Sequence, residues 1–275
     1  MKGTILGDIV GSPYEFCASP VKTKDFIWFA EGSRFTDDTV TTVAVAAALA
    51  EGKESRCGYI KPLRRQLKYW CRRYPNAGFG RQFACWFSSD DSAPYGSYGN
   101  GAAMRVAPAA WVGRSLDEAQ ALAEITALVT HDHPEAVQGA VAVASAIYLA
   151  RTGSSKDDIR AYMRKYFYPL TASLDEIRPG YAFTCRTADS VPEAIEAFLE
   201  SDSLQDAIGN AVSLGGDTDT QAAIAGSIAE AFYGVPDWLW QKACSYLPKD
   251  MLSVVVNFER QYMKSGAISW PTKNF

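Results

Sequence analysis

Two short acidic segments hold the residue types that bind hard metal ions. Residues 35–39 read FTDDT, and residues 215–220 read GGDTDT. Each segment places two carboxylates and threonine hydroxyls within a few residues, directly before a long apolar stretch rich in small side chains. Carboxylate and hydroxyl oxygens are the ligands that Mg²⁺ and Mn²⁺ prefer in proteins. Two such segments, far apart in the sequence, therefore predict the two halves of one metal site.

Helix capping is the alternative interpretation of both segments. Side-chain oxygens of Ser, Thr and Asp satisfy the free N–H groups of a first helical turn, and carboxylates suit the positive end of the helix dipole. One aspartate is enough for that purpose, whereas adjacent aspartates repel each other. Two segments of this kind concentrate negative charge that calls for a counter-cation, so we favour the metal site.

Three other acidic motifs do not match the sequence. A haloacid-dehalogenase phosphatase needs Asp-x-Asp-x-Thr or Val, but Gln221 occupies the last of these positions. An HD-type phosphohydrolase needs a further histidine ahead of its His-Asp pair, and no histidine precedes His131. A calcium EF-hand needs a glutamate at the twelfth loop position, and the residues after Gln221 do not continue as such a loop.

The length and composition of the chain indicate a globular protein. The chain has 275 residues, of which 48% are hydrophobic and 21% charged, so a sizeable core can form. No linker or internal repeat is visible, and we expect a single domain over residues 1–275. The net charge is −4 and no basic stripe is evident, which argues against a groove for nucleic acid.

Cysteine usage and the apolar segments indicate a cytoplasmic protein. The six cysteines form no CxxC pair and only two histidines are present, so a zinc site of ordinary spacing is excluded. The Ala-rich stretches at 40–50 and 136–150 are shorter than a membrane span. The first residues include Asp8 and Glu15 and do not fit a signal peptide.

The apolar spacing predicts an all-α fold. Long Ala-rich stretches, apolar residues at helical spacing and capping residues define the elements. The predicted helices cover residues 40–50, 115–130, 134–150, 157–167, 221–233 and 249–263, with two more that begin at Ser190 and Ser203. Only residues 26–29 show a strand-like pattern. Small residues dominate the central helices and permit close packing.

Three long segments read as loops, at residues 11–32, 75–101 and 171–189. All three are richer in Gly, Pro, Ser and aromatic residues than the rest of the chain. Long loops in a compact helical protein are usually functional. We therefore expect the substrate to contact them.

Five motifs in a fixed order give the chain a family resemblance. They are GDIVGSPYE at 7–15, FTDDT at 35–39, GSYGNGAAMR at 96–105, THDHP at 130–134 and GGDTDT at 215–220. Each motif alone is weak, but the ordered set is specific and spans residue 3 to about residue 236. With these motifs the chain resembles the ADP-ribosylglycohydrolase family, also called the dinitrogenase-reductase-activating glycohydrolase or ADP-ribosylhydrolase family.

The resemblance implies a compact, all-α orthogonal helical bundle with a binuclear Mg²⁺ or Mn²⁺ centre in a cleft. It implies metal ligands at Thr36, Asp37, Asp38, Asp217, Asp219 and Thr220. It places a mobile glutamate near the scissile bond at Glu15, the diphosphate at Gly96, Ser97, Tyr98, Gly99 and Asn100, the ribose beside His131 and, by a looser match, the adenosine side against Tyr181.

Each of these residues also has a simpler interpretation. The glycine-exposed N–H groups of residues 96–101 suit a diphosphate in a protein without a basic patch, but they also suit an ordinary loop. His131 could be a core histidine, and Glu15 could be a surface carboxylate. We expect His133 to cap the following helix and Asp8 to accept backbone hydrogen bonds in the N-terminal turn.

The implied reaction is hydrolysis of the bond between the anomeric carbon of ADP-ribose and a protein side chain of arginine or serine type. It passes through an oxocarbenium-like state, and Glu15, Asp38 or Asp217 carries the proton. The expected partners are the ADP-ribosylated protein and the product ADP-ribose, and we expect a monomer. Three alternatives remain: another ADP-ribosyl conjugate such as a nucleic acid or O-acetyl-ADP-ribose, a non-catalytic ADP-ribose-binding homologue, and a metal-dependent phosphohydrolase.

Overall fold

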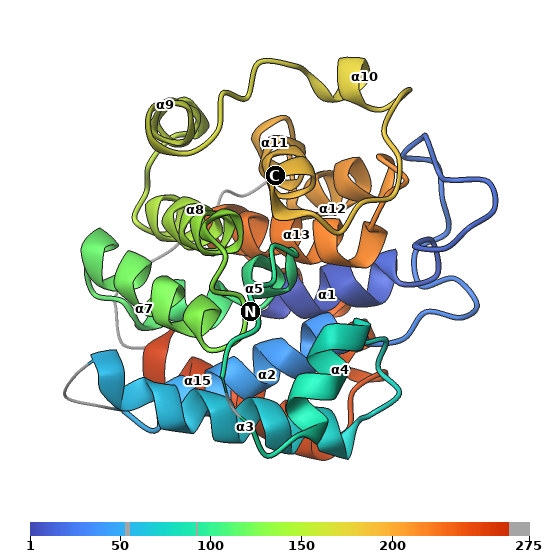
Figure 1. Cartoon of the computed structure of the whole chain (residues 1–275). Coiled ribbons are helices and arrows are strands. Elements are labelled where there is room, and N and C mark those ends of the chain that lie inside the picture. The colour runs from blue at the N-terminus through green and yellow to red at the C-terminus, as the bar shows by residue number, and fades with distance from the viewer. Residues whose placement is uncertain (53–55, 92, 264–275) are drawn as a thin grey trace.

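The computed structural model describes residues 1–52, 56–91 and 93–263, and these residues fold into α-helices joined by loops (Figure 1). The prediction of an all-α fold is confirmed. The longer helices are α1 (Lys2–Gly11), α2 (Asp37–Ala50), α3 (Ile60–Arg73), α7 (Leu116–Leu128), α8 (Pro134–Arg151), α9 (Lys156–Tyr166), α13 (Thr218–Tyr233) and α15 (Lys249–Tyr262). The shorter helices are α4 (Arg81–Ser88), α5 (Gly101–Met104), α6 (Ala107–Val112), α10 (Leu174–Ile177), α11 (Val191–Leu199), α12 (Leu204–Val212) and α14 (Asp237–Cys244), and the 3₁₀ turns are η1 (Arg56–Tyr59) and η2 (Thr187–Asp189).

Helix α13 lies near the centre of the molecule, where α1, α8, α11 and α12 pack around it (Figure 1). Nearly all of its residues are buried, which explains why its sequence has no polar face. Helix α1 approaches it closely because glycines face it. A Cβ atom added at Gly7 would lie 2.0 Å from the carbonyl oxygen of Ala222, so any larger residue would force the two helices apart.

Helices α2 and α13 both begin beside α1. The acidic segments lie at these N-termini and are therefore brought to the same place. Thr36 caps α2, since its side chain accepts a hydrogen bond from the N–H group of Asp38. The turn before α13 passes through Gly215, which has a φ of +67°, a backbone conformation that glycine adopts without strain.

All eight predicted helices are confirmed, within a few residues at their ends. His133 caps α8 as expected, with Nδ1 accepting the N–H group of Glu135. The strand-like pattern at 26–29 is wrong, because Phe29 has a φ of 54° within a turn. The predicted loop at 75–101 contains α4, and the predicted loop at 171–189 contains α10 and η2. The helices α1, α3, α5, α6 and α14 were also not predicted.

The reasons for the missed helices are physical. Helix α3 is strongly amphipathic, with Leu63, Leu67 and Trp70 buried on one side, but polar residues occupy most positions between them, so it has no long apolar stretch. Helix α1 is buried on nearly all sides, so no polar face marks it as a helix.

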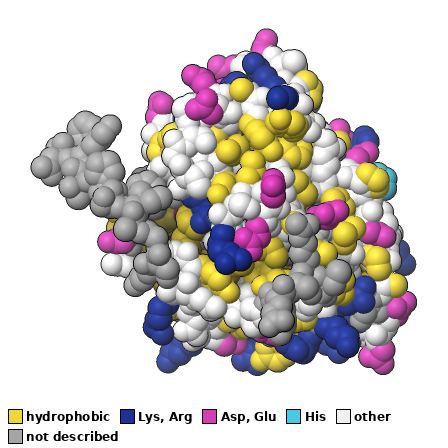
Figure 2. Space-filling model, turned by 90° about the vertical axis from the view of Figure 1, so that its left-hand side faces the viewer, with side chains coloured by type: hydrophobic (Ala, Val, Ile, Leu, Met, Phe, Trp, Pro, Cys, Tyr) yellow, Lys and Arg dark blue, Asp and Glu magenta, His cyan; other side chains and the backbone are white. Residues whose placement is uncertain are grey.

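Acidic and basic side chains are interspersed with hydrophobic ones on the face shown in Figure 2. Across the described part of the chain, no helix has both the length and the apolar character that crossing a lipid bilayer requires.

Candidate active site

The two acidic segments meet in one cavity of about 460 Å³. The hydroxyl of Thr220, in the first turn of α13, donates a hydrogen bond to Asp38 Oδ2 across 3.2 Å. Asp38 lies in the first turn of α2, so this bond joins the N-termini of the two helices. The predicted residues that line the cavity are Glu15, Asp37, Asp38, Ser97, Gly99, Asn100, His131, Asp217, Asp219 and Thr220.

The Asp8 carboxylate of α1 holds the first acidic segment in place through hydrogen bonds. One of its carboxylate oxygens accepts the Thr36 hydroxyl at 2.7 Å, and the other accepts the N–H groups of Thr36 and Thr39 at 2.9 and 3.1 Å. The Thr39 hydroxyl donates to the same carboxylate. Asp8 is structural, as predicted, but the prediction of its partners was wrong: it holds the start of α2 and not its own turn, because α1 packs directly beside α2.

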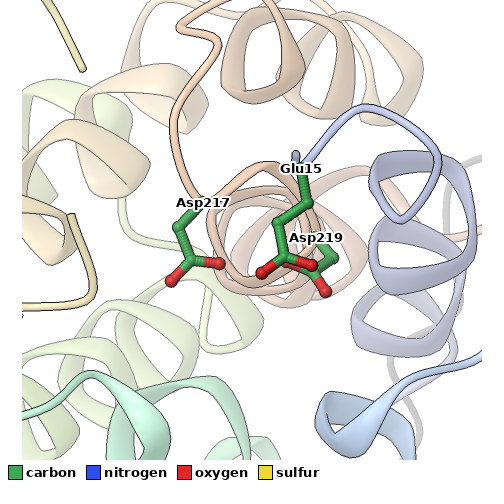
Figure 3. Close-up of side chains that lie close together, drawn as sticks. All are labelled: Glu15, Asp217 and Asp219. Atoms are coloured by element: carbon green, nitrogen blue, oxygen red, sulfur yellow. The ribbon is translucent and has the colours of Figure 1, made fainter. Parts of the chain in front are cut away.

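Glu15 reaches the second acidic segment from the loop after α1. Its carboxylate and those of Asp217 and Asp219 each offer an oxygen within 4.8 Å of the others. Figure 3 shows the Glu15 and Asp219 carboxylates side by side, with Asp217 next to them on the turn into α13. Asp217 and Asp219 are buried and Glu15 is partly exposed, so Glu15 covers the group from the solvent side.

Burial and mutual repulsion raise the pKa values of these carboxyl groups. Burial, then the charge of Asp219, raises the pKa of Asp37 to about 8 and the pKa of Glu15 to about 8. The same two causes raise the pKa values of Asp38 and Asp217 well above the ordinary range. Crowded acids of this kind are stabilised either by protons or by a cation.

The residues present fit divalent cations. Every atom in the cluster that could bind a cation is an oxygen, as Mg²⁺ and Mn²⁺ require. Asp38 Oδ1 is buried and has no hydrogen-bond partner among the described residues, so one acceptor remains open for a cation. The oxygens of Glu15, Asp217 and Asp219 lie within 4.8 Å of one another, so the three carboxylates face one small space.

Residues 96–101 approach the acidic cluster through Asn100. Its amide group donates to Asp217 Oδ2 at 2.8 Å and to the Ser190 hydroxyl at 3.2 Å. Ser190 begins α11, but its hydroxyl donates to the Arg186 carbonyl and does not cap the helix, contrary to prediction. Asn100 therefore fixes the position of Asp217 relative to the loop.

His131 lies under the same loop as a buried, neutral imidazole. Burial, then the charge of Arg105, lowers the pKa of His131 well below its ordinary value. The Thr130 hydroxyl accepts a hydrogen bond from Arg105 Nη2 at 2.7 Å and lies 2.7 Å from His131 Nδ1. When the Thr130 hydroxyl donates its proton to Nδ1, the imidazole proton is on Nε2. A Cβ added at Gly101 would lie 2.9 Å from Nε2.

The family model described as ADP-ribosylglycohydrolase matches residues 1–263. The chain therefore belongs to the ADP-ribosylglycohydrolase family.

Individual relatives agree with this assignment. The chain is 31% identical to the Bos taurus ADP-ribosylhydrolase ARH3, over 62% of this chain and 60% of that protein. It is 29% identical to the Mus musculus ARH3, over 89% of this chain and 86% of that protein. The ADP-ribosylarginine hydrolase Tri1 of Pseudomonas putida (strain GB-1) is 28% identical over 88% of this chain and 73% of its own length. A solved ADP-ribosylglycohydrolase-related protein complex shares the fold, with a TM-score of 0.70 at 22% identity over 95% of both chains.

Four residues that the resemblance to the ADP-ribosylglycohydrolase family singled out are not in the cavity lining. Thr36 is buried next to it, where its hydroxyl donates to Asp8 Oδ1 at 2.7 Å. Gly96 and Tyr98 lie at the edge of the cavity, where Gly96 N donates to Asp132 and the Tyr98 side chain is exposed. Tyr181 instead packs behind the second acidic segment. A Cβ at Gly216 would lie 2.5 Å from its ring, and its hydroxyl accepts from Gln221 Nε2 at 2.8 Å.

Several residues that line the cavity of this ADP-ribosylglycohydrolase family member were not predicted from the sequence. Phe16 and Phe183 come from two of the predicted loops and contact each other at the cavity, with ring centroids 5.4 Å apart. Arg105 is buried beneath the cavity floor. The start of α4 and the residues before it line a further wall. The aromatic residues in the loops were a usable signal, and so was the helical spacing of Phe83, Trp86 and Phe87 in α4.

Proposed function

We propose that this protein is a metal-dependent ADP-ribosylhydrolase that cleaves the glycosidic bond between ADP-ribose and a modified protein side chain. One observation carries the proposal: both acidic segments and Glu15 converge in one cavity of a chain that belongs to the ADP-ribosylglycohydrolase family. The proposed cofactors are two Mg²⁺ or Mn²⁺ ions held by Thr36, Asp37, Asp38, Asp217, Asp219 and Thr220. Such ions, when bound, supply Lewis acidity and orient hydroxyl groups and water.

Uncharged groups in the cavity lining suit the rest of the ligand. The N–H groups of Gly99 and Asn100 donate here to Ser97 Oγ and to the Cys185 carbonyl, and we propose that they exchange these acceptors for diphosphate oxygens when the ligand binds. The His131 imidazole can donate from Nε2 to a ribose oxygen, since it is neutral and buried. Phe16 and Phe183 give the cavity an apolar boundary that limits the access of water.

Glu15 is the preferred proton carrier, with Asp38 and Asp217 as the other candidates. A proton carrier works best when its pKa lies near the working pH. Burial and the charges of Asp219 and Asp37 raise the pKa of Glu15 to about 8 in the metal-free protein, and bound cations would lower it from there. Its partial exposure also leaves it room to move, whereas Asp38 and Asp217 are enclosed.

The acceptor is proposed to be an arginine or a serine side chain. The Tri1 relatives are named for ADP-ribosylarginine, which supports testing arginine first. The alternative is another ADP-ribosyl conjugate, such as a nucleic acid or O-acetyl-ADP-ribose. A monomer, a single domain over residues 1–275 and a cytoplasmic location stay predictions.

A substrate panel tests the proposal. Peptides ADP-ribosylated on arginine or serine, an ADP-ribosylated oligonucleotide and O-acetyl-ADP-ribose would be incubated with Mg²⁺, Mn²⁺ or EDTA, and free ADP-ribose measured by chromatography. We expect release from a peptide with metal and none with EDTA, and none from Asp217→Ala in any condition. Asp157→Ala, which removes an exposed acid on α9, should behave as wild type.

The other outcomes each identify an alternative. Binding of ADP-ribose without turnover of any substrate would indicate a non-catalytic homologue. Release of phosphate or AMP in place of ADP-ribose would indicate a phosphohydrolase. Unchanged activity in a rigorously metal-free sample would exclude the proposed cofactors.

A further inference from the structure

Lys22 joins three segments that are far apart in the sequence. It lies in the loop that also carries Glu15, and its ammonium group donates to two backbone carbonyls, those of Leu214 and Tyr181, both at 2.6 Å. Leu214 precedes the GGDTDT segment, and Tyr181 lies in the loop that carries Phe183. One side chain therefore connects both loops of the cavity to the segment that carries Asp217.

A second, independent contact fixes the same loop on the turn before α13. A Cβ added at Gly215 would lie 2.7 Å from the Val21 carbonyl oxygen and 2.8 Å from Pro20 Cβ. The loop thus lies directly against the turn, and Lys22 follows at once. Because of this packing, a movement of the loop would displace the turn at Gly215 and with it Asp217, two residues later.

The two loops also meet at the cavity itself. Phe16 and Phe183 contact each other there, and Arg178 Nε donates to the Ser213 hydroxyl at 3.0 Å behind it. The Phe16–Phe183 contact can form only if both loops keep their present places. The two hydrogen bonds of Lys22 join its loop both to the second loop and to Leu214, directly before the acidic segment.

We propose that Lys22 is a positioning residue, which holds the loop of Glu15 and the loop of Phe183 in fixed places on the segment of Asp217. The inference rests on the proposed function, since it assigns Lys22 a role in placing Glu15 for that reaction. Lys22 itself does not touch the cavity. Its effect on turnover comes from geometry, where a displacement of about 1 Å can cost about 100-fold in rate.

Lys24 provides a matched control in the same loop. Its ammonium group bonds to Asp206 Oδ1 of α12 at 2.7 Å, and its side chain is 51% exposed. Lys24→Met therefore removes the same kind of side chain and one ion pair, but no bond to the second loop or to the acidic segment. Lys22→Met removes both carbonyl bonds, while Lys22→Arg keeps a charged donor for them.

The experiment compares these variants in the full chain by three measurements. These are kcat and KM for the best substrate of the panel, Mn²⁺ affinity by calorimetry, and amide hydrogen exchange of residues 12–32 and 178–190. For Lys22→Met we expect kcat to fall by about 10- to 100-fold, weaker Mn²⁺ binding and faster exchange in both loops. Lys22→Arg should recover most of the activity, and Lys24→Met should stay within about threefold of wild type, since exposed ion pairs contribute little.

Two results would overturn the proposal. One is a Lys22→Met protein that matches Lys24→Met in all three measurements. The other is faster exchange throughout the chain, which would assign Lys22 to general stability; Lys22→Gln, a milder change, repeats the test if Lys22→Met does not fold. If the wild type hydrolyses no ADP-ribosyl substrate, the proposed function fails, and the exchange and Mn²⁺ measurements still decide the role of Lys22.

Discussion

Thr220 donates a hydrogen bond to Asp38 across 3.2 Å, although 182 positions separate them in the sequence. Both residues lie in the first turn of a helix, so the bond brings the positive ends of α2 and α13 to one place. These helix ends offset part of the negative charge of the acidic segments. A bound cation would neutralise the remaining negative charge of these segments.

Asp8→Asn should destabilise the protein and lower its activity. The amide can accept fewer of the hydrogen bonds that Thr36 and Thr39 donate, and its NH₂ group would face their N–H groups. We expect the free energy of unfolding to fall by roughly 2–3 kcal/mol, measured by urea denaturation. Asp157→Asn, an exposed change on α9, should stay within about 0.5 kcal/mol of wild type. Equal stability of the two variants would contradict the role given to Asp8.

Divalent cations should raise the melting temperature. Binding to the folded state alone stabilises it by about 2.7 kcal/mol at a concentration 100 times the Kd. We expect Mg²⁺ or Mn²⁺ to shift the melting curve upward by several degrees, and NaCl of equal ionic strength not to do so. Asp217→Ala should abolish the shift. An unchanged curve at millimolar Mg²⁺ would count against a shared metal site.

Without metal, the protein should lose stability as the pH rises from about 4 to about 8. Asp37 and Glu15 have folded-state pKa values of about 8, far above their ordinary values. Between the two values the folded state holds protons that the unfolded state has lost, so stability falls as pH rises. Melting temperatures in EDTA across this range would measure the slope. Metal binding should flatten it and release protons, which calorimetry in two buffers can detect.

Glu15→Gln should reduce turnover by about 10²- to 10⁴-fold, the range typical of general acid–base groups. ADP-ribose should still bind, because residues 96–101 and the aspartates are unchanged. Single-turnover kinetics and calorimetry would separate the two effects. Glu31→Gln, an exposed change in the same loop, is the control.

The position of Glu15 makes the metal affinity of that variant informative. Its carboxylate lies within 4.8 Å of Asp217 and Asp219 oxygens. If Mn²⁺ affinity and turnover collapse together in Glu15→Gln, Glu15 is a metal ligand and not a proton carrier. If turnover survives, the proton carrier is one of the aspartates.

The residue types and their local spacing determined much of this protein. Helical periodicity and capping residues predicted the all-α class and most helices, because these signals depend only on neighbours within a few positions. The five ordered motifs led to the ADP-ribosylglycohydrolase family. The oxygen-rich segments at 35–39 and 215–220 carried their chemistry in the sequence itself.

Tertiary structure decided which residues meet. Asp8 holds α2 because α1 packs beside α2, and Glu15 reaches Asp217 because the glycines of α1 let it pack tightly against α13. Lys22 bonds to Leu214 because its loop lies against Gly215. Tyr181 lies behind the acidic segment and not in the cavity because its ring packs against Gly216 and its hydroxyl accepts from Gln221 Nε2. Such contacts depend on how whole helices pack, and no local pattern encodes the distance between side chains that are far apart along the chain.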